Sequence, residues 1–143
     1  MTDLERPELD KRRVAASFGR AAPTYDDHDF VQREIAARAL ERLDYMTMKP
    51  RLVLDLGSGT GRCARTLAKR YARSQVVQFD LAPAMLERAR AAEPRFFSRQ
   101  RFVAGDFEHL PFKPAAFDMA FSSLALQWCE QPHTAFTEIR RVL

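Results

Sequence analysis

The chain has 143 residues, of which 46% are hydrophobic and 29% charged, and its formal net charge is +4. Length and composition are those of one globular domain. The longest apolar runs end well before the ~18 residues of a membrane span, and no apolar signal core follows the start, so we expect a cytoplasmic protein without membrane contact. Cys63 and Cys129 are too few for a disulfide framework, and no metal-ligand spacing surrounds them.

The N-terminal part predicts a helical arm. Residues from about Pro7 to Phe18 are charged and favour a helix, and GRAAPTYDDHD then brings glycine, proline and aspartates that interrupt it. The segment 30–43 predicts an amphipathic helix, whose apolar face recurs at every fourth position, namely Val31, Ile35, Ala39 and Leu43. We expect residues 1–45 to form an arm or lid and residues 46–143 to form the core.

After Pro50, short apolar runs alternate with helical segments. The pattern predicts strands at 51–56, 75–80, 101–104 and 117–122, and helices at 61–71, 83–92 and 133–142. Such alternation implies right-handed crossovers and a parallel sheet covered on both faces, which is a doubly wound, Rossmann-like α/β fold. A typical sheet has about five to six strands, so we expect the C-terminal strands of this fold to be missing.

A glycine loop follows the first predicted strand in the stretch LVLDLGSGTGR, residues 52–62. Open parallel sheets bind ligands at this place, and glycines allow close approach of the backbone. The dinucleotide fingerprint is G-x-G-x-x-G, whereas Gly57, Gly59 and Gly61 give G-x-G-x-G. Asp55 would repel a pyrophosphate and suits a ligand with an ammonium or other positive charge. An NAD-dependent dehydrogenase is therefore disfavoured.

Two more acids end the next two predicted strands. Asp80 closes VVQFD, where a carboxylate accepts hydrogen bonds from vicinal ribose hydroxyls, and Asp106 in VAGDFEHLPF is placed to accept from an exocyclic adenine amine. A ligand with cationic, ribose and aminopurine parts is S-adenosylmethionine. Taken singly, Asp55 is also compatible with a helix N-cap, Asp80 with an ordinary strand end, and Met85 with core packing.

These residues resemble the class I S-adenosylmethionine-dependent methyltransferases. VLDLGSGTG is similar to their first motif, APAMLERAR to the helix after the ribose-binding acid, AGDFEHLPF to the adenine-contacting segment, and FDMAFSSLALQW to the fourth strand and its cofactor-facing loop. Within the class, KRRVAASFGRAAPTYDDHDFVQRE and SSLALQWCEQPHTAFTEIRRVL resemble the malonyl-[acyl-carrier protein] O-methyltransferase family of the biotin pathway. Ser58 and Ser123 replace a common cysteine and asparagine, and family members continue well beyond Leu143.

The resemblance implies a cofactor site at the strand ends. The cofactor-binding residues it implies are Asp55, Gly57, Ser58, Gly59, Gly61, Asp80, Leu81, Met85, Asp106, Phe107 and Ser122. It also implies that the arm folds over the cofactor, with Tyr25 positioning the methyl group and Gln32 nearby, and that Trp128 lies on the acceptor side. Packing on a helix is the alternative for Tyr25, and core packing for Trp128.

The implied activity is methylation of the free carboxylate of malonyl-acyl-carrier protein, or malonyl-CoA, early in pimeloyl and biotin synthesis. A methyltransferase for another small molecule, such as a quinone precursor, and a non-catalytic methyltransferase-like assembly factor remain open. A nucleic-acid methyltransferase is disfavoured, because residues 122–125 read SSLA rather than a D/N-P-P-Y-like loop and the basic residues are scattered. The expected partner is an acyl-carrier protein or a small acceptor.

Overall fold

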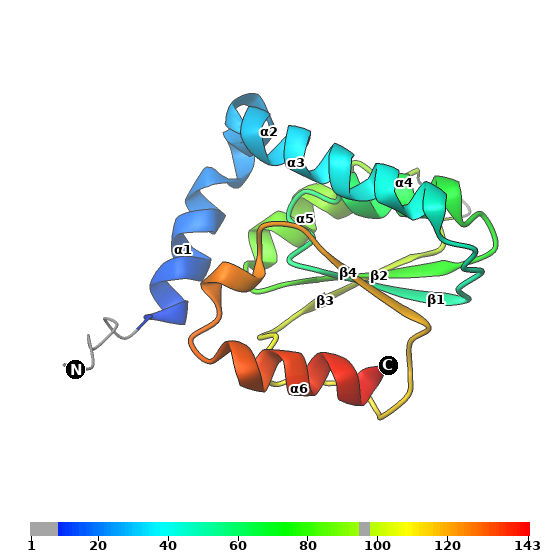
Figure 1. The fold of residues 1–143 in the computed structure, drawn as a ribbon. Helices are drawn as coiled ribbons and strands as arrows, with labels where there is room; N and C mark the ends of the chain where they lie inside the picture. Colours follow the sequence, from blue (N-terminus) through cyan, green and yellow to red (C-terminus); the bar gives the residue numbers. More distant parts are fainter. Residues whose placement is uncertain (1–8, 95–97) are drawn as a thin grey trace.

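The computed structural model describes residues 9–94 and 98–143, and a four-stranded parallel sheet lies at its centre (Figure 1). The strand order is β3-β2-β1-β4. The strands are β1 (Leu52–Leu56), β2 (Gln75–Asp80), β3 (Gln100–Ala104) and β4 (Met119–Ser122). The predicted α/β fold with a parallel sheet is confirmed, and the predicted strand boundaries differ by no more than the usual uncertainty of one or two residues.

Helices cover both faces of this sheet, as predicted. In Figure 1, α4 (Arg62–Arg70) and α5 (Pro83–Ala91) lie above the sheet and α6 (Pro132–Val142) lies below it. A short 3-10 helix, η3 (Leu126–Trp128), joins β4 to α6. Pro83 and Pro132 begin their helices, where the missing N–H of proline removes no helical hydrogen bond.

The core has two layers because successive strand residues point to opposite faces. Leu54 and Leu56 of β1 pack with Phe79 in the cluster that α6 completes. Val53 and Val76 instead pack with helices on the other face. Asp55 shares the face of Val53 and is 2% exposed. The alternation that builds the core therefore also buries one carboxylate beneath the glycine loop.

The arm is helical almost throughout. It consists of α1 (Lys11–Ala21), η1 (Ala22–Thr24), α2 (Tyr25–His28), α3 (Phe30–Glu41) and η2 (Arg42–Tyr45). The interruption expected after Phe18 is confirmed: α1 ends at Ala21, Pro23 lies in the 3-10 turn η1, and Asp29 separates α2 from α3. Asp10 caps α1 by accepting from the N–H groups of Arg12 and Arg13. The predicted start near Pro7 lies outside the described residues.

The predicted buried face of α3 is wrong at its N-terminal end. Val31 and Ile35 are 60% and 40% exposed, and Ala36 and Leu40 are buried in their place. Both pairs have the four-residue spacing of a helical stripe, so spacing alone does not choose between them. The small side chain of Ala36 lies on the side of α4, Leu40 packs with residues of the sheet and of α4, and Leu43 is buried as expected.

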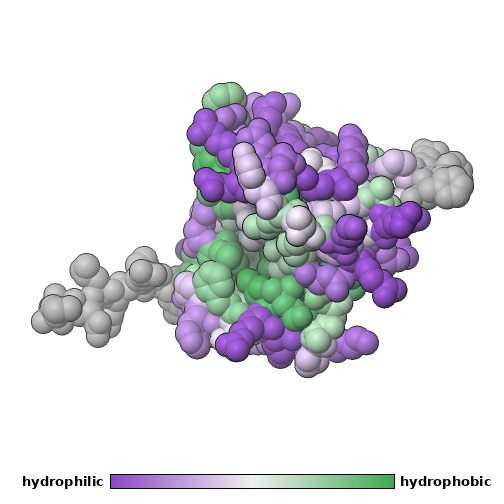
Figure 2. Space-filling model, turned by 45° about the vertical axis from the view of Figure 1, so that its right-hand side comes forward, coloured by the Kyte–Doolittle hydropathy of each residue, from purple (hydrophilic) through white to green (hydrophobic). Residues whose placement is uncertain are grey.

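The surface is mainly hydrophilic over the helices. Figure 2 shows hydrophobic residues gathered in the middle of one face, below a mostly hydrophilic upper part. Exposed apolar side chains outside α3 include Leu124, Trp128 and Phe136. Among the helices that the structure describes, none has the length and apolar character needed to cross a bilayer.

We expect Leu54→Ala to lower the free energy of unfolding by about 2 to 5 kcal/mol, because Leu54 is fully buried between the sheet and α6. Leu52→Ala, at a half-buried position of the same strand, is the matched control and is expected to cost about 1 kcal/mol. Equilibrium denaturation in urea measures both. Equal losses for the two variants would contradict the deeper burial of Leu54 in this cluster.

Candidate functional site

A pocket lies where the carboxyl ends of the strands meet the arm. Among the residues singled out from the sequence, ten line it: Tyr25, Gln32, Gly57, Gly59, Asp80, Leu81, Met85, Asp106, Phe107 and Trp128. Six lining residues were not among them: Lys11, Val14, Phe18, Ser123, Leu124 and Ala125. Residues far apart in the sequence thus converge at the sheet edge where ligands of this fold class bind.

Four of the expected cofactor residues do not line this pocket. Ser58 lines an adjoining hollow together with Gly57 and Gly59. Asp55 is buried beneath the loop, Gly61 begins α4, and the Ser122 hydroxyl donates to the Leu56 carbonyl at 2.9 Å. These four residues lie behind the pocket lining rather than in it.

The glycine loop depends on left-handed backbone conformations. Gly57, Gly59 and Gly61 have φ values of 70°, 54° and 83°. A Cβ on Gly57 would overlap the Cβ of Ala125, whereas a Cβ on Gly59 would meet no atom within 4 Å. The segment after β4 therefore packs directly on the loop, and the backbone of Gly59 stays open to the pocket.

Asp80 holds the loop in place. One of its carboxylate oxygens accepts from the Gly59 N–H at 2.8 Å, and the other accepts from the Ala82 N–H at 2.8 Å. A carboxylate offers about four acceptor sites, so Asp80 keeps capacity for donors on a ligand. Burial raises the pKa of Asp80, against the effect of these backbone hydrogen bonds.

Asp55 is a buried carboxyl with an oxygen, Oδ2, that has no hydrogen-bond partner among the described residues. Burial and then the charge of Asp80 raise the pKa of Asp55 to about 7, and the backbone hydrogen bond from Ala64 only partly opposes them. A cation near the loop would favour the ionised form of this carboxyl.

Asp106 faces the arm. Its Oδ2 lies 2.6 Å from the Nζ of Lys11, and its Oδ1 accepts from the Glu108 N–H at 3.0 Å. Burial opposes ionisation of Asp106, but the hydrogen bond and charge of Lys11 outweigh it and lower its pKa. Lys11 also lies 2.8 Å from Glu108. The Lys11–Asp106 ion pair joins residues 95 positions apart, and no local pattern in the sequence indicates it.

The arm is tied to the glycine loop as well. Arg62, at the start of α4, lies 2.5 Å from the carboxylate of Asp29 and 3.4 Å from that of Asp26. The Thr60 hydroxyl donates to Asp26 at 2.6 Å. Asp29 is 5% exposed, so its pairing with Arg62 offsets the cost of burying its charge.

Three aromatic rings border the pocket between these two attachments. Phe18 packs edge-on against Trp128 at 5.5 Å between ring centroids, and against Tyr25 at 6.4 Å. Burial raises the pKa of Tyr25, helped by the charge of Asp29, so its phenol is neutral at physiological pH. Trp128 is 39% exposed, which leaves part of its ring open at the pocket mouth.

The two cysteines are free, and burial raises the pKa of Cys63 to about 12 and that of Cys129 to about 11. Neither is a thiolate at neutral pH, so neither acts as a nucleophile. Within residues 9–94 and 98–143, no cluster of three or more ligating side chains is suited to hold a metal ion. The chemistry of the site therefore rests on carboxylates, backbone donors and aromatic rings.

Residues 54–143 match the family model described as "Methyltransferase domain". The chain belongs to the methyltransferase-domain family. This stretch runs from Leu54 in β1 through the glycine loop and all three strand-end acids to α6. It therefore includes the pocket residues of the core but not those of the arm. The resemblance to class I methyltransferases drawn from the sequence is confirmed.

Relatives agree with this assignment. The chain is 46% identical over 142 residues to "Malonyl-[acyl-carrier protein] O-methyltransferase" of Halorhodospira halophila, covering 99% of this chain and 48% of that protein. Four further relatives of the same name are 40–45% identical. The chain thus spans about half the length of these curated relatives, and the finer resemblance to this family is confirmed.

Solved structures share the fold. One is a putative methyltransferase from Haloferax volcanii in complex with the Trm112 activator, with TM-score 0.77, 29% identity, and coverage of 88% of this chain and 55% of that one. Another is an S-adenosylmethionine-dependent methyltransferase from Mesorhizobium loti, with TM-score 0.62, 34% identity, and coverage of 76% and 50%.

We expect Gly61→Ala to destabilise the chain more than Gly59→Ala. Both force a left-handed conformation that costs an L-residue about 1 to 2 kcal/mol, but only the Cβ at position 61 meets a neighbour, the Gln78 Oε1 at 2.6 Å. Repacking at that contact adds about 1 to 3 kcal/mol. Denaturant midpoints measure the difference, and a greater loss for Gly59→Ala would contradict the loop geometry.

The raised pKa of Asp55 predicts that the stability of the folded chain depends on pH. Its pKa is 3.8 ordinarily and about 7 in the folded chain, so between these values the folded state binds more protons than the unfolded state. The Asp55 contribution to the free energy of unfolding therefore falls as pH rises through this window and is level above it. Unfolding titrations of the wild type and Asp55→Asn over this range isolate it, and a pH-independent difference would contradict it.

Proposed function

We propose that this chain is the cofactor-binding half of an S-adenosylmethionine-dependent O-methyltransferase that methylates the free carboxylate of a malonyl group on acyl-carrier protein or coenzyme A. The observation that carries the proposal is the convergence of Asp80, Asp106 and the glycine loop on one pocket. The name shared by relatives at 40–46% identity supports the choice of acceptor.

The pocket fits each part of this cofactor. Asp80 keeps acceptor capacity for the ribose hydroxyls beside the open backbone of Gly59. Asp106, with Phe107 and the buried Met85 beside it, suits an adenine ring and its amino group. The unpartnered Oδ2 of Asp55 and Oγ of Ser58 lie behind the loop, where the methionine part would place positive charge. Leu81 and Gly57 complete the wall.

The proposed methyl transfer requires little from the protein beyond alignment of the reacting atoms. When bound, the cofactor supplies a methyl group on a positively charged sulfur, which is already activated for in-line displacement. The acceptor carboxylate is ionised at neutral pH and needs no general base. This agrees with a pocket whose titratable groups include acids that attract cations but no histidine. Alignment of reacting atoms contributes several of the ~7 to 11 kcal/mol available from proximity.

We propose residues 1–45 as the cover of this site and residues 46–143 as its base. The arm reaches the pocket through Phe18, Tyr25 and Gln32, and ion pairs attach it at Lys11 and at Asp29. Tyr25 would position the methyl end of the cofactor, and Trp128 would lie on the acceptor side with its exposed edge. Exclusion of water strengthens the charge interactions inside the site.

The first test is calorimetric titration of the chain with S-adenosylmethionine and, separately, NAD. We expect binding of the former alone. Asp80→Ala should weaken it at least about tenfold, because a hydrogen bond to a charged group contributes roughly 1.5 to 3 kcal/mol. Asp44→Ala, an exposed aspartate of η2 paired with Arg70, is the matched control and should bind as the wild type does.

The acceptor is tested with the same protein extended to the full length of its relatives. Methyl transfer to malonyl-acyl-carrier protein should exceed transfer to a phenolic quinone precursor. A preference for the phenol would favour the other small-molecule methyltransferase. Cofactor binding without transfer to either acceptor, or no cofactor binding by the folded protein, would contradict the proposed activity and favour an assembly role.

A further inference from the structure

Lys11 is the one cation among the described residues that line the pocket. Its ammonium group lies 2.6 Å from Asp106 Oδ2 and 2.8 Å from Glu108 Oε2. The side chains of Lys11 and Glu108 are 21% and 6% exposed, so this is a largely desolvated arrangement rather than a surface ion pair. Lys11 stands in the first turn of α1, at the end of the pocket that Asp106 and Phe107 define.

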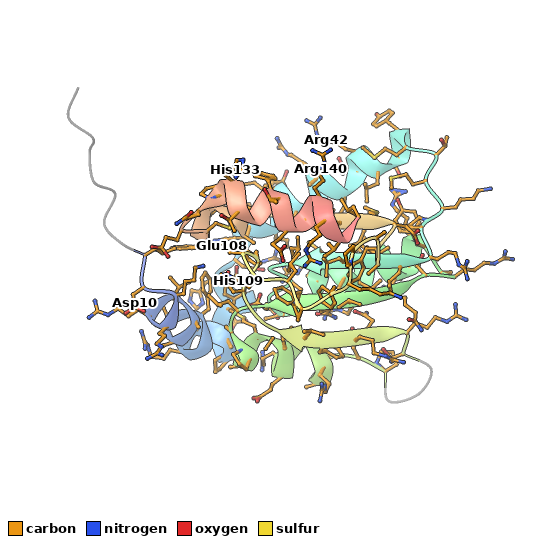
Figure 3. The ribbon with its side chains drawn as sticks, turned by 90° about the horizontal axis from the view of Figure 1, so that it is seen from below. Asp10, Arg42, Glu108, His109, His133 and Arg140 are labelled. Atoms are coloured by element: carbon orange, nitrogen blue, oxygen red, sulfur yellow. The ribbon has the colours of Figure 1, made fainter. Side chains whose placement is uncertain are left out.

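Glu108 connects this contact to a third segment. Its Oε1 accepts from the N–H of Glu130 at 2.7 Å and from the N–H of Gln131 at 3.0 Å, directly before α6. Figure 3 labels Glu108 beside the beginning of α6, on the side of the molecule where α1 lies. Lys11 therefore joins the arm to the segment after β3 and, through Glu108, to the segment after β4.

The neighbouring cations of α1 do not share this role. Among the described residues Arg13 pairs only with Asp10, the N-cap of its own helix, at 3.4 Å, and its side chain is 89% exposed. Near its last turn α1 is also held by Phe18, which packs edge-on against Trp128 and against the buried cluster of Ala22, Ala82 and Met85. Charge at the first turn and apolar packing near the last turn thus both hold α1 in place.

The pairing also sets the orientation of Asp106. The Glu108 N–H occupies Oδ1 and Lys11 occupies Oδ2, which holds the carboxylate plane between two fixed donors. A carboxylate has about two acceptor sites on each oxygen, so one on each oxygen remains for an amino group in the pocket. The charge of Lys11 keeps Asp106 ionised and able to accept.

We propose that Lys11 is a positioning residue that locks α1 over the adenine end of the pocket and holds Asp106 in the orientation that receives the adenine amino group. This inference rests on the proposed function. It predicts that the ion pairs of Lys11 with Asp106 and Glu108 slow the release of the bound nucleoside. Opening of α1 must break the Lys11 contacts with both carboxylates, whereas Arg12 and Arg13 are free to move with the helix.

The test uses Lys11→Met, with Lys11→Arg as the conservative variant and Arg13→Met as the matched control on the same helix. Amide hydrogen exchange over residues 11–21 of the unliganded chain reports how often α1 opens. We expect Lys11→Met to accelerate this exchange about tenfold or more, because removal of one partner leaves a desolvated acid pair. Arg13→Met should match the wild type, and Lys11→Arg should restore most of the protection.

Stopped-flow release of S-adenosylhomocysteine is the second measurement. Lys11→Met should raise the release rate about tenfold or more with a smaller change in the association rate, and Lys11→Arg should recover slow release. Unchanged exchange and unchanged release in Lys11→Met would overturn the inference, and so would an equal effect of Arg13→Met. If the wild type fails to bind the nucleoside, the role toward Asp106 is overturned together with the proposed cofactor, while hydrogen exchange still decides whether Lys11 locks α1.

Discussion

The hydrogen bonds of Asp80 are the constraint on which the site depends. This carboxylate ends β2, accepts from the Gly59 N–H in the loop after β1, and accepts from the Ala82 N–H at the start of α5. Gly57 and Ser58 also donate to the carbonyl of Phe79, the preceding residue. The end of one strand thus fixes the path of the loop that follows its neighbour, and that path requires glycine at three positions of positive φ.

This arrangement gathers negative charge in a buried place. Burial raises the pKa of both Asp55 and Asp80, and the charge of Asp80 raises the pKa of Asp55 further. Its hydrogen bonds to the loop give Asp80 a structural role, but such a role gives no reason for Asp55, whose Oδ2 has no hydrogen-bond partner among the described residues. A cationic ligand explains the cost, since it favours the ionised forms.

Local patterns predicted the base of the site but not its cover. The place of Asp55, Asp80 and the glycines at a ligand site could be predicted because strand, loop and helix follow one another within a few residues. Parallel strands also place their carboxyl ends at one edge of the sheet. The role of Lys11 could not be predicted from the sequence, because its partners Asp106 and Glu108 lie about a hundred positions away. Nothing in the neighbouring sequence distinguishes it from Arg12 or Arg13.

The face of α3 was misjudged for a related reason. Val31 and Ile35 are more apolar than Ala36, and a hydrophobicity pattern ranks them first. The structure buries Ala36 because the helix lies close to α4, and close approach favours a small side chain over a branched one. Helix position thus depends on shape complementarity with a distant segment, which the spacing of apolar residues does not contain.

The two attachments of the arm explain how it is held beside the pocket. Asp29 with Arg62 holds the arm beside the glycine loop, and Lys11 with Asp106 and Glu108 holds it at the opposite end. Between them, Phe18 and Tyr25 bring apolar surface over the strand ends. Since both attachments are ion pairs with at least one nearly buried acid, each resists opening more than a surface pair would. For the proposed carboxylate acceptor, which is a weak nucleophile in water, a cover that removes water and fixes direction would contribute where no proton has to be transferred.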